Sequence, residues 1–140
     1  MAAKARLYVD SSAYLGVLAG SGPAAGMEAE LRRAILLSSV VFVLEVQRNL
    51  VRWAREKVLT SAQYTELSDR FRQDLAGFTL RDVTLDLCAA TSMPAAMLPR
   101  SLDLLHLRTA QWFHVQRPIT RFVSLDKAQN QAARDLGLPV

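Results

Sequence analysis

Residues 6–15 read Arg-Leu-Tyr-Val-Asp-Ser-Ser-Ala-Tyr-Leu, a short apolar run followed by an aspartate and a helix-like start. Its bulky run, Leu7 to Val9, suits a strand covered on both faces, and Ser11 and Ser12 are good caps for a following helix. Asp10 therefore lies at the carboxyl end of a predicted strand. In parallel sheets the functional crevice lies beyond those ends, which makes Asp10 a candidate site residue. The alternative is that Asp10 only caps the helix, because aspartate is a preferred N-cap residue.

The composition fits one globular domain over residues 1–140. Of the 140 residues 51% are hydrophobic, which is enough for one well-filled core. The 17 Lys and Arg against 13 Asp and Glu give a net charge of +4, which favours a polyanion such as nucleic acid as partner without requiring one. The only cysteine, Cys88, cannot form an internal disulfide, and we predict a buried, inert thiol.

The hydropathy pattern argues against export and membrane insertion. No long apolar run precedes Asp10, and the longest apolar stretch, Ala34 to Leu44, is interrupted by Ser38 and Ser39. We therefore expect a cytoplasmic protein with no membrane partner.

Strand-like and helix-like segments alternate along the chain. A helix is predicted over Met27 to Leu36, and the β-branched run Val40-Val41-Phe42-Val43 then suggests a second buried strand. Alternation with short connections predicts an α/β fold, a three-layer α/β/α sandwich with a mostly parallel central sheet. Its strands are expected to begin near four residues: Leu7, Val40, Phe78 and Ile119.

Four carboxylates fall where this sheet would gather them. Asp10, Glu45 and Asp126 each come just after a predicted strand, and Asp103 lies in the first turn of a helix with Ser101 as expected N-cap. Two carboxylates about 4 Å apart repel by roughly 4 kcal/mol at an effective dielectric near 20, so a cluster needs a cation or raised pKa values. Oxygen ligands select Mg²⁺ or Mn²⁺, which can activate water for phosphodiester hydrolysis. Alternatively, each acid is a separate cap or solvated charge.

Basic side chains lie near the acids in sequence. His106 follows Asp103 by one helical turn and is expected to be packed or hydrogen-bonded, with a substrate contact as the alternative. Nearby cations are candidates for holding RNA phosphates, although most basic side chains are simply solvated. They are Arg48, Arg52, Arg100, Arg121 and Lys127, of which we select Arg48, Arg100 and Lys127 as substrate-binding residues.

Four segments in this order resemble a known family. They are Tyr8-Val9-Asp10-Ser11-Ser12-Ala13, Leu44-Glu45-Val46 with Arg48, Arg100-Ser101-Leu102-Asp103-Leu104-Leu105-His106-Leu107, and Phe122-Val123-Ser124-Leu125-Asp126. The sequence resembles the PIN-domain ribonucleases, specifically the VapC-type toxins of bacterial toxin-antitoxin pairs. The resemblance runs nearly end to end and includes the tail from Ala132 to Val140. Each motif alone is weak, but their ordered combination is specific.

The resemblance implies an endoribonuclease that depends on Mg²⁺, with Mn²⁺ as a possible substitute. It assigns four acids as catalytic metal ligands and adds two substrate-site hydroxyls, Ser12 and Ser124. The acids are Asp10, Glu45, Asp103 and Asp126, of which Asp126 corresponds to the least uniform ligand of the family. One departure is Arg108, where the family usually has a small residue, so that local packing or a substrate contact is expected to differ.

The resemblance also implies partners: a second copy of the chain in a homodimer, a cognate antitoxin protein, and RNA. The sequence does not indicate which RNA is cleaved, because RNA readout depends on surface shape and loops. The alternative is a catalytically inactive PIN-like module that binds RNA or protein, which holds if the four acids do not converge.

Overall fold

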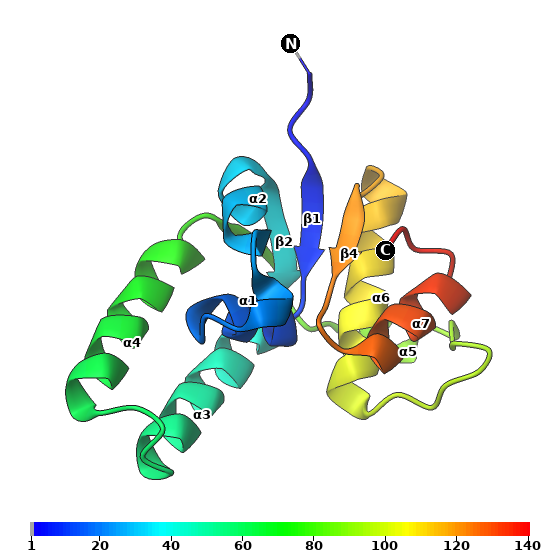
Figure 1. The fold of residues 1–140 in the computed structure, drawn as a ribbon. Coiled ribbons are helices and arrows are strands. Elements are labelled where there is room, and N and C mark those ends of the chain that lie inside the picture. The colour runs from blue at the N-terminus through cyan, green and yellow to red at the C-terminus, as the bar shows by residue number, and fades with distance from the viewer. Residues whose placement is uncertain (1) are drawn as a thin grey trace.

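The computed structural model describes residues 2–140 and shows a parallel sheet with helices on both faces (Figure 1). The strands are β1 (Arg6–Val9), β2 (Ile35–Ser39), β3 (Phe78–Arg81) and β4 (Arg121–Val123), in the order β3-β2-β1-β4. All neighbouring strands pair in parallel, with Tyr8 of β1 opposite Leu37 of β2 and Phe122 of β4. The α/β class and the parallel sheet expected from the sequence are confirmed.

The helices form the two outer layers. Strand β1 shows why, since Leu7 and Val9 belong to one apolar core and Tyr8 to the other, as the alternation of side chains along a strand requires. Helices α1, α3 and α4 pack on the first core, and α6 and α7 on the second (Figure 1). The helical elements are α1 (Ser11–Leu18), the 3₁₀ turn η1 (Gly22–Ala24), α2 (Met27–Arg33), α3 (Val41–Arg55), α4 (Ser61–Leu75), α5 (Leu85–Ala89), α6 (Ser101–Gln116) and α7 (Lys127–Asp135).

The second strand lies elsewhere than predicted. The structure places β2 at Ile35–Ser39, while the run Val40 to Val43 begins helix α3, and the helix predicted up to Leu36 ends at Arg33. The continuous apolar run 34–44 contains both the strand and the helix start, and a short apolar run does not reveal where one ends. Tertiary contacts determine the boundary: Ser38 is fully buried, and its Oγ donates a hydrogen bond to the carbonyl of Val9 in β1 at 2.7 Å.

Two smaller expectations are also corrected. Cys88 is exposed, because in the short helix α5 it is Leu87 that turns inward. Strand β4 begins at Arg121, two residues later than expected. Among residues 2–140, no helix combines the length and apolarity needed to cross a membrane.

The position of Phe42 in helix α3 gives a direct test of the corrected register. Its side chain is fully buried and its ring contacts Tyr14, Phe71 and Phe78. Phe42→Ala should lower the free energy of unfolding by about 3–5 kcal/mol, measured by urea denaturation.

Leu44, two residues further on, is 68% exposed and is the control. Leu44→Ala should change the free energy of unfolding by no more than about 0.5 kcal/mol. In a strand, residues 42 and 44 would face the same side, so similar losses for the two variants would contradict the helical register.

Candidate active site

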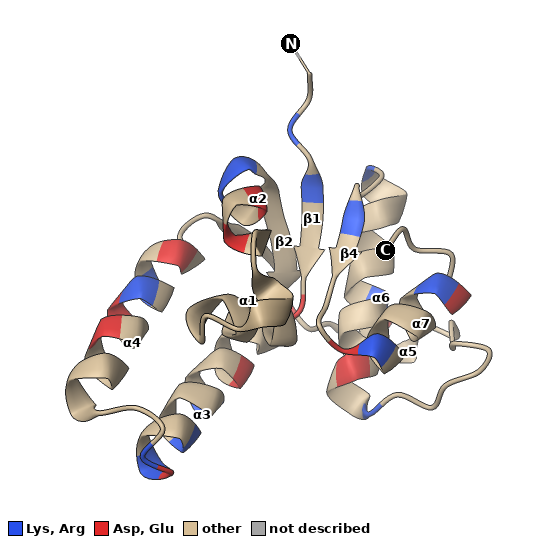
Figure 2. Cartoon of the chain, viewed as in Figure 1, with Lys and Arg blue, Asp and Glu red and all other residues tan. Residues whose placement is uncertain are grey.

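A cleft of about 550 Å³ opens beside the carboxyl ends of β1 and β4. Figure 2 shows acidic segments at these two strand ends and on α3 and α6, all near the same end of the sheet. The four predicted acids line this cleft, together with other residues from the same segments. The lining is Asp10, Ser11, Ser12, Leu15, Glu45, Arg48, Asn49, Arg52, Arg100, Ser101, Leu102, Asp103, His106 and Asp126.

Asp10 is both the N-cap of α1 and a wall of the cleft. Its Oδ1 accepts hydrogen bonds from the backbone N–H of Ala13 at 3.2 Å and from the hydroxyl of Ser12 at 2.7 Å. The predicted capping by Ser11 or Ser12 is therefore wrong, because the Asp10 carboxylate already occupies the cap. The two interpretations of Asp10, helix cap and site residue, do not exclude one another.

Ser12 and Ser124 link the ends of two strands. Their hydroxyl oxygens lie 3.1 Å apart, and the Ser12 hydroxyl also accepts from the backbone N–H of Leu125 at 3.0 Å. Ser124 is buried behind Ser12 and, among the described residues, is not part of the cleft lining. The geometry gives Ser124 a positioning contact with Ser12, while its predicted substrate contact is untested.

Asp10 is only 6% exposed, and this burial raises the pKa of its carboxyl group. Hydrogen bonds from the serine hydroxyls and the nearby His106 act in the opposite direction without cancelling the effect of burial. The surrounding fold thus disfavours the negative charge of Asp10, and a cation beside it would relieve that cost.

Glu45 reaches the cleft from within helix α3 and not from a strand end, as the sequence had suggested. Its Oε1 lies 2.5 Å from Nε2 of His106, and Nδ1 of His106 lies 2.8 Å from the hydroxyl of Tyr8. His106 is 1% exposed, so the expectation of a packed, hydrogen-bonded histidine is confirmed. Burial raises the pKa of Tyr8 well above its usual value, which keeps its hydroxyl protonated. Sequence reasoning missed this chain of contacts because Tyr8 and His106 are 98 residues apart.

Asp103 and Asp126 line the opposite side of the cleft. Asp103 lies in the first turn of α6, where its Oδ2 is 3.3 Å from Nε of Arg100. Arg100, and not the predicted Ser101, is the N-cap of α6, and its side chain makes no capping hydrogen bond. Asp126 is the N-cap of α7, and its Oδ1 accepts from the backbone N–H groups of Ala128 at 2.9 Å and Gln129 at 3.2 Å.

Four carboxylates line one cleft, and carboxylate oxygens are the ligand type that a hard divalent cation prefers. However, across residues 2–140 no three His, Cys, Asp or Glu side chains stand as a ready metal-binding group. Glu45 contacts His106 and Asp103 contacts Arg100, so an ion would compete with both contacts.

The predicted basic residues divide into two groups. Arg48, Arg52 and Arg100 line the cleft, whereas Lys127 is outside the lining that the structure describes. Arg121 is also not suited to holding an RNA phosphate, because its guanidinium forms an ion pair with Glu30 at 2.5 Å.

Arg108, where the sequence departs from the family pattern, has a packing role. Its Nη1 donates to the backbone carbonyl of Cys88 at 2.8 Å, and its Nη2 lies 3.5 Å from the carbonyl of Ser92. The Arg108 side chain thus connects the segment after α5 to helix α6 through hydrogen bonds.

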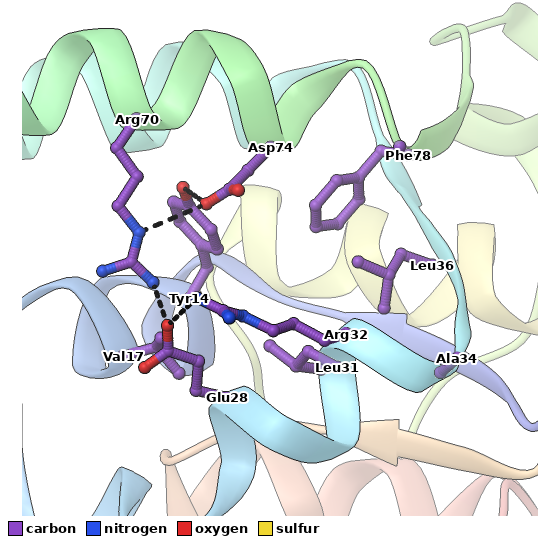
Figure 3. Close-up of a pocket in the computed structure, with 11 residues that line it drawn as sticks. Tyr14, Val17, Glu28, Leu31, Arg32, Ala34, Leu36, Arg70, Asp74 and Phe78 are labelled. Carbon is purple, nitrogen blue, oxygen red and sulfur yellow. Dashed lines mark hydrogen bonds and ion pairs between the residues drawn. The ribbon is translucent and has the colours of Figure 1, made fainter.

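A second cavity of about 180 Å³ lies between α1, α2, α4 and the neighbouring strands (Figure 3). Its charged groups satisfy one another: Glu28 accepts from Arg32 and Arg70, both at 2.8 Å, and Asp74 accepts from the hydroxyl of Tyr14 at 2.7 Å. Burial, together with Asp74, raises the pKa of Tyr14. This network links helices α1, α2 and α4 through side-chain hydrogen bonds and ion pairs.

No protein-family model matches this chain, and no curated protein matches it either. The resemblance to PIN-domain ribonucleases therefore stays a prediction.

Asp10→Asn should stabilise the metal-free fold at neutral pH. The variant keeps a capping oxygen but lacks the buried charge. Because the carboxyl pKa is higher in the folded than in the unfolded chain, the wild type loses stability as the pH rises through these two values. The gain should vanish below about pH 4, the range of an unperturbed aspartate, where both states are protonated.

The measurement is urea denaturation in excess chelator across this pH range. Asp126→Asn, which removes a carboxylate at an exposed N-cap, is the matched control and should not stabilise the fold at neutral pH, because negative charge is favourable at the start of a helix. A difference between Asp10→Asn and wild type that does not change with pH would contradict the role of the buried charge.

Proposed function

We propose that this chain is a metal-dependent endoribonuclease, and that it acts as a VapC-type toxin in the cytoplasm. One observation carries the proposal: four carboxylates from four separate segments line one cleft that arginines also line. The sequence resemblance assigns the same four acids as catalytic residues, and the parallel sheet explains why residues so distant in sequence lie together.

In this proposal Asp10, Glu45 and Asp103 hold the ion, and Asp126 assists, with one of its oxygens already engaged by the cap of α7. Mg²⁺ or Mn²⁺ held by these acids would supply an activated water and charge stabilisation for phosphodiester hydrolysis. The backbones of Glu45 and Asp103 are fixed within helices α3 and α6, and those of Asp10 and Asp126 at the N-caps of α1 and α7. Ser12 orients Asp10 through its 2.7 Å hydrogen bond.

Arginines offset the repulsion between an acidic cleft and an anionic substrate. Arg48, Arg52 and Arg100 present guanidinium groups that can bind phosphate oxygens through two parallel hydrogen bonds. Arg100 has two possible partners. It contacts Asp103 in the structure, and it could bind a phosphate instead if Asp103 bound the ion.

A second candidate function is a catalytically inactive module that binds RNA or protein. The observation that favours it is the lack of a ready three-ligand group within residues 2–140. The two candidates differ in metal-dependent cleavage.

Asp103→Asn, Asp10→Asn and Glu45→Gln should each lower Mn²⁺ affinity and RNA cleavage together. The loss should exceed the roughly 10–100-fold caused by removing an outer-shell partner of a metal, because each variant removes a ligand charge. Cleavage is measured by sequencing the ends of total RNA incubated with Mg²⁺, Mn²⁺ or excess chelator, and Mn²⁺ binding by calorimetry.

Asp69→Asn, on the exposed surface of α4, is the charge-matched control and should retain both properties. Cleavage that persists in chelator, or full activity in all three cleft variants, would refute the metal mechanism. RNA binding without cleavage in either metal would support the inactive module.

We further propose that the chain forms a homodimer and that a cognate antitoxin covers the cleft in the cell. The mixed lining of acids and arginines suits a partner chain with both basic and acidic side chains. Light scattering at tens of micromolar, roughly the range where weak specific dimers form, should give twice the chain mass. A monomer at this concentration would contradict self-association.

A further inference from the structure

Helix α3 carries three arginines in a row that leads away from the cleft. Arg48, Arg52 and Arg55 are spaced four and three residues apart, so they lie along one side of the helix. Arg48 and Arg52 line the cleft, and Arg55 continues beyond the lining. At 1.5 Å per residue the row extends about 10 Å along the helix axis. Figure 2 shows basic segments in the half of α3 that lies farther from the sheet.

These three arginines are exposed, and none of them forms an ion pair among the described residues. The contrast with the neighbouring helix α4 is clear, because Arg70 and Arg72 there each pair with an aspartate. Like charges four residues apart on a helix repel one another. The row therefore costs the free protein some stability that an anion would restore.

A simpler role explains only part of the row. Arg52 and Arg55 lie in the last turn of α3, where positive charge complements the helix dipole. Arg48 lies about two turns before the helix end, outside the range of that effect, yet it continues the same row. A ligand with regularly spaced negative charges accounts for all three positions.

We propose that Arg48, Arg52 and Arg55, the arginine row, bind successive phosphates of a single-stranded RNA that leaves the carboxylate cleft along α3. This inference rests on the proposed ribonuclease function and specifies its substrate class. A scissile phosphate must approach Asp10, which is 6% exposed, and a flexible single strand can bend into such a cleft. Readers of duplex RNA instead span successive minor grooves over about 16 base pairs, which one row on one helix does not do.

The test measures RNA binding, not cleavage. A fluorescent single-stranded RNA of about twelve nucleotides, within the usual 4–16-nucleotide footprint of single-strand sites, is titrated with protein in excess chelator at several salt concentrations. Each phosphate contact contributes about 0.7 to the slope of log affinity against log salt. Replacing all three arginines by glutamine should lower the slope by about 2, and Arg55→Gln alone by about 0.7.

Arg33→Gln is the matched control. Arg33 is also exposed and free of ion pairs within the described chain, but it precedes β2 and so lies at the amino end of the sheet, away from the cleft. Its substitution should leave the slope unchanged. The same loss of slope in Arg33→Gln, or an unchanged slope in the triple variant, would overturn the proposal.

Two further arms identify the ligand. On a blunt RNA duplex of the same sequence, the triple substitution should not change the slope, and an equal change would overturn the single-strand assignment. Polyglutamate binding lost in the triple variant, with RNA binding retained, would assign the row to an acidic protein and overturn the proposal. Because RNA binding is measured in chelator, where no cleavage is assayed, loss of ribonuclease activity would not alter the binding result. A failed binding prediction would likewise not decide whether the chain cleaves RNA.

Discussion

The structure depends on the central position of strand β1. This strand pairs with β2 on one side and β4 on the other, and its residues from Leu7 to Val9 are almost completely buried. A strand buried in this way ends only where the chain can satisfy its polar groups. Asp10 does so by capping α1, and Ser12 then bonds both Asp10 and the backbone after β4. The candidate site is therefore built on the end of the most buried strand.

The alternation of side chains along β1 also determines which helix supports Glu45. Leu7 and Val9 point toward α1 and α3, so Tyr8 must point toward α6. There its hydroxyl meets His106, whose other nitrogen contacts Glu45 on α3. Tyr8, a core residue, thus helps to orient the carboxylate of Glu45 in the cleft. The contact of His106 on α6 with Glu45 on α3 joins the two helical layers at the cleft.

Much of this arrangement could be predicted from the sequence, and the failures have a physical cause. The apolar run from Leu7 to Val9 and the alternating segment from Phe78 to Val83 predicted strands that the structure contains as β1 and β3. The run from Ala34 to Leu44 is apolar throughout, so only tertiary packing separates β2 from α3. That error moved Glu45 from a strand end into a helix, yet it still reached the cleft because α3 starts directly after β2.

Side-chain partners at the site were less predictable than the positions of the acids. An N-cap or a strand end is local in sequence, and Asp10, Asp103 and Asp126 could be placed from such signals. The contact of Glu45 with His106, and the packing of Arg108 on the segment after α5, depend on elements brought together by the whole fold. Lys127 was selected from its closeness in sequence to Asp126, but it is not among the described residues that line the cleft.

The charges of the cleft show how such a site can be held in a stable fold without an ion. The carboxylates of Glu45 and Asp103 have partners in His106 and Arg100, and Asp126 is satisfied by a helix end. Burial of the Asp10 carboxylate carries a cost, which its hydrogen bonds reduce. In the proposed ribonuclease, an ion would remove that cost and compete for Glu45 and Asp103. Arg100, freed from Asp103, would then face the substrate phosphate, so that metal binding and RNA binding would favour one another.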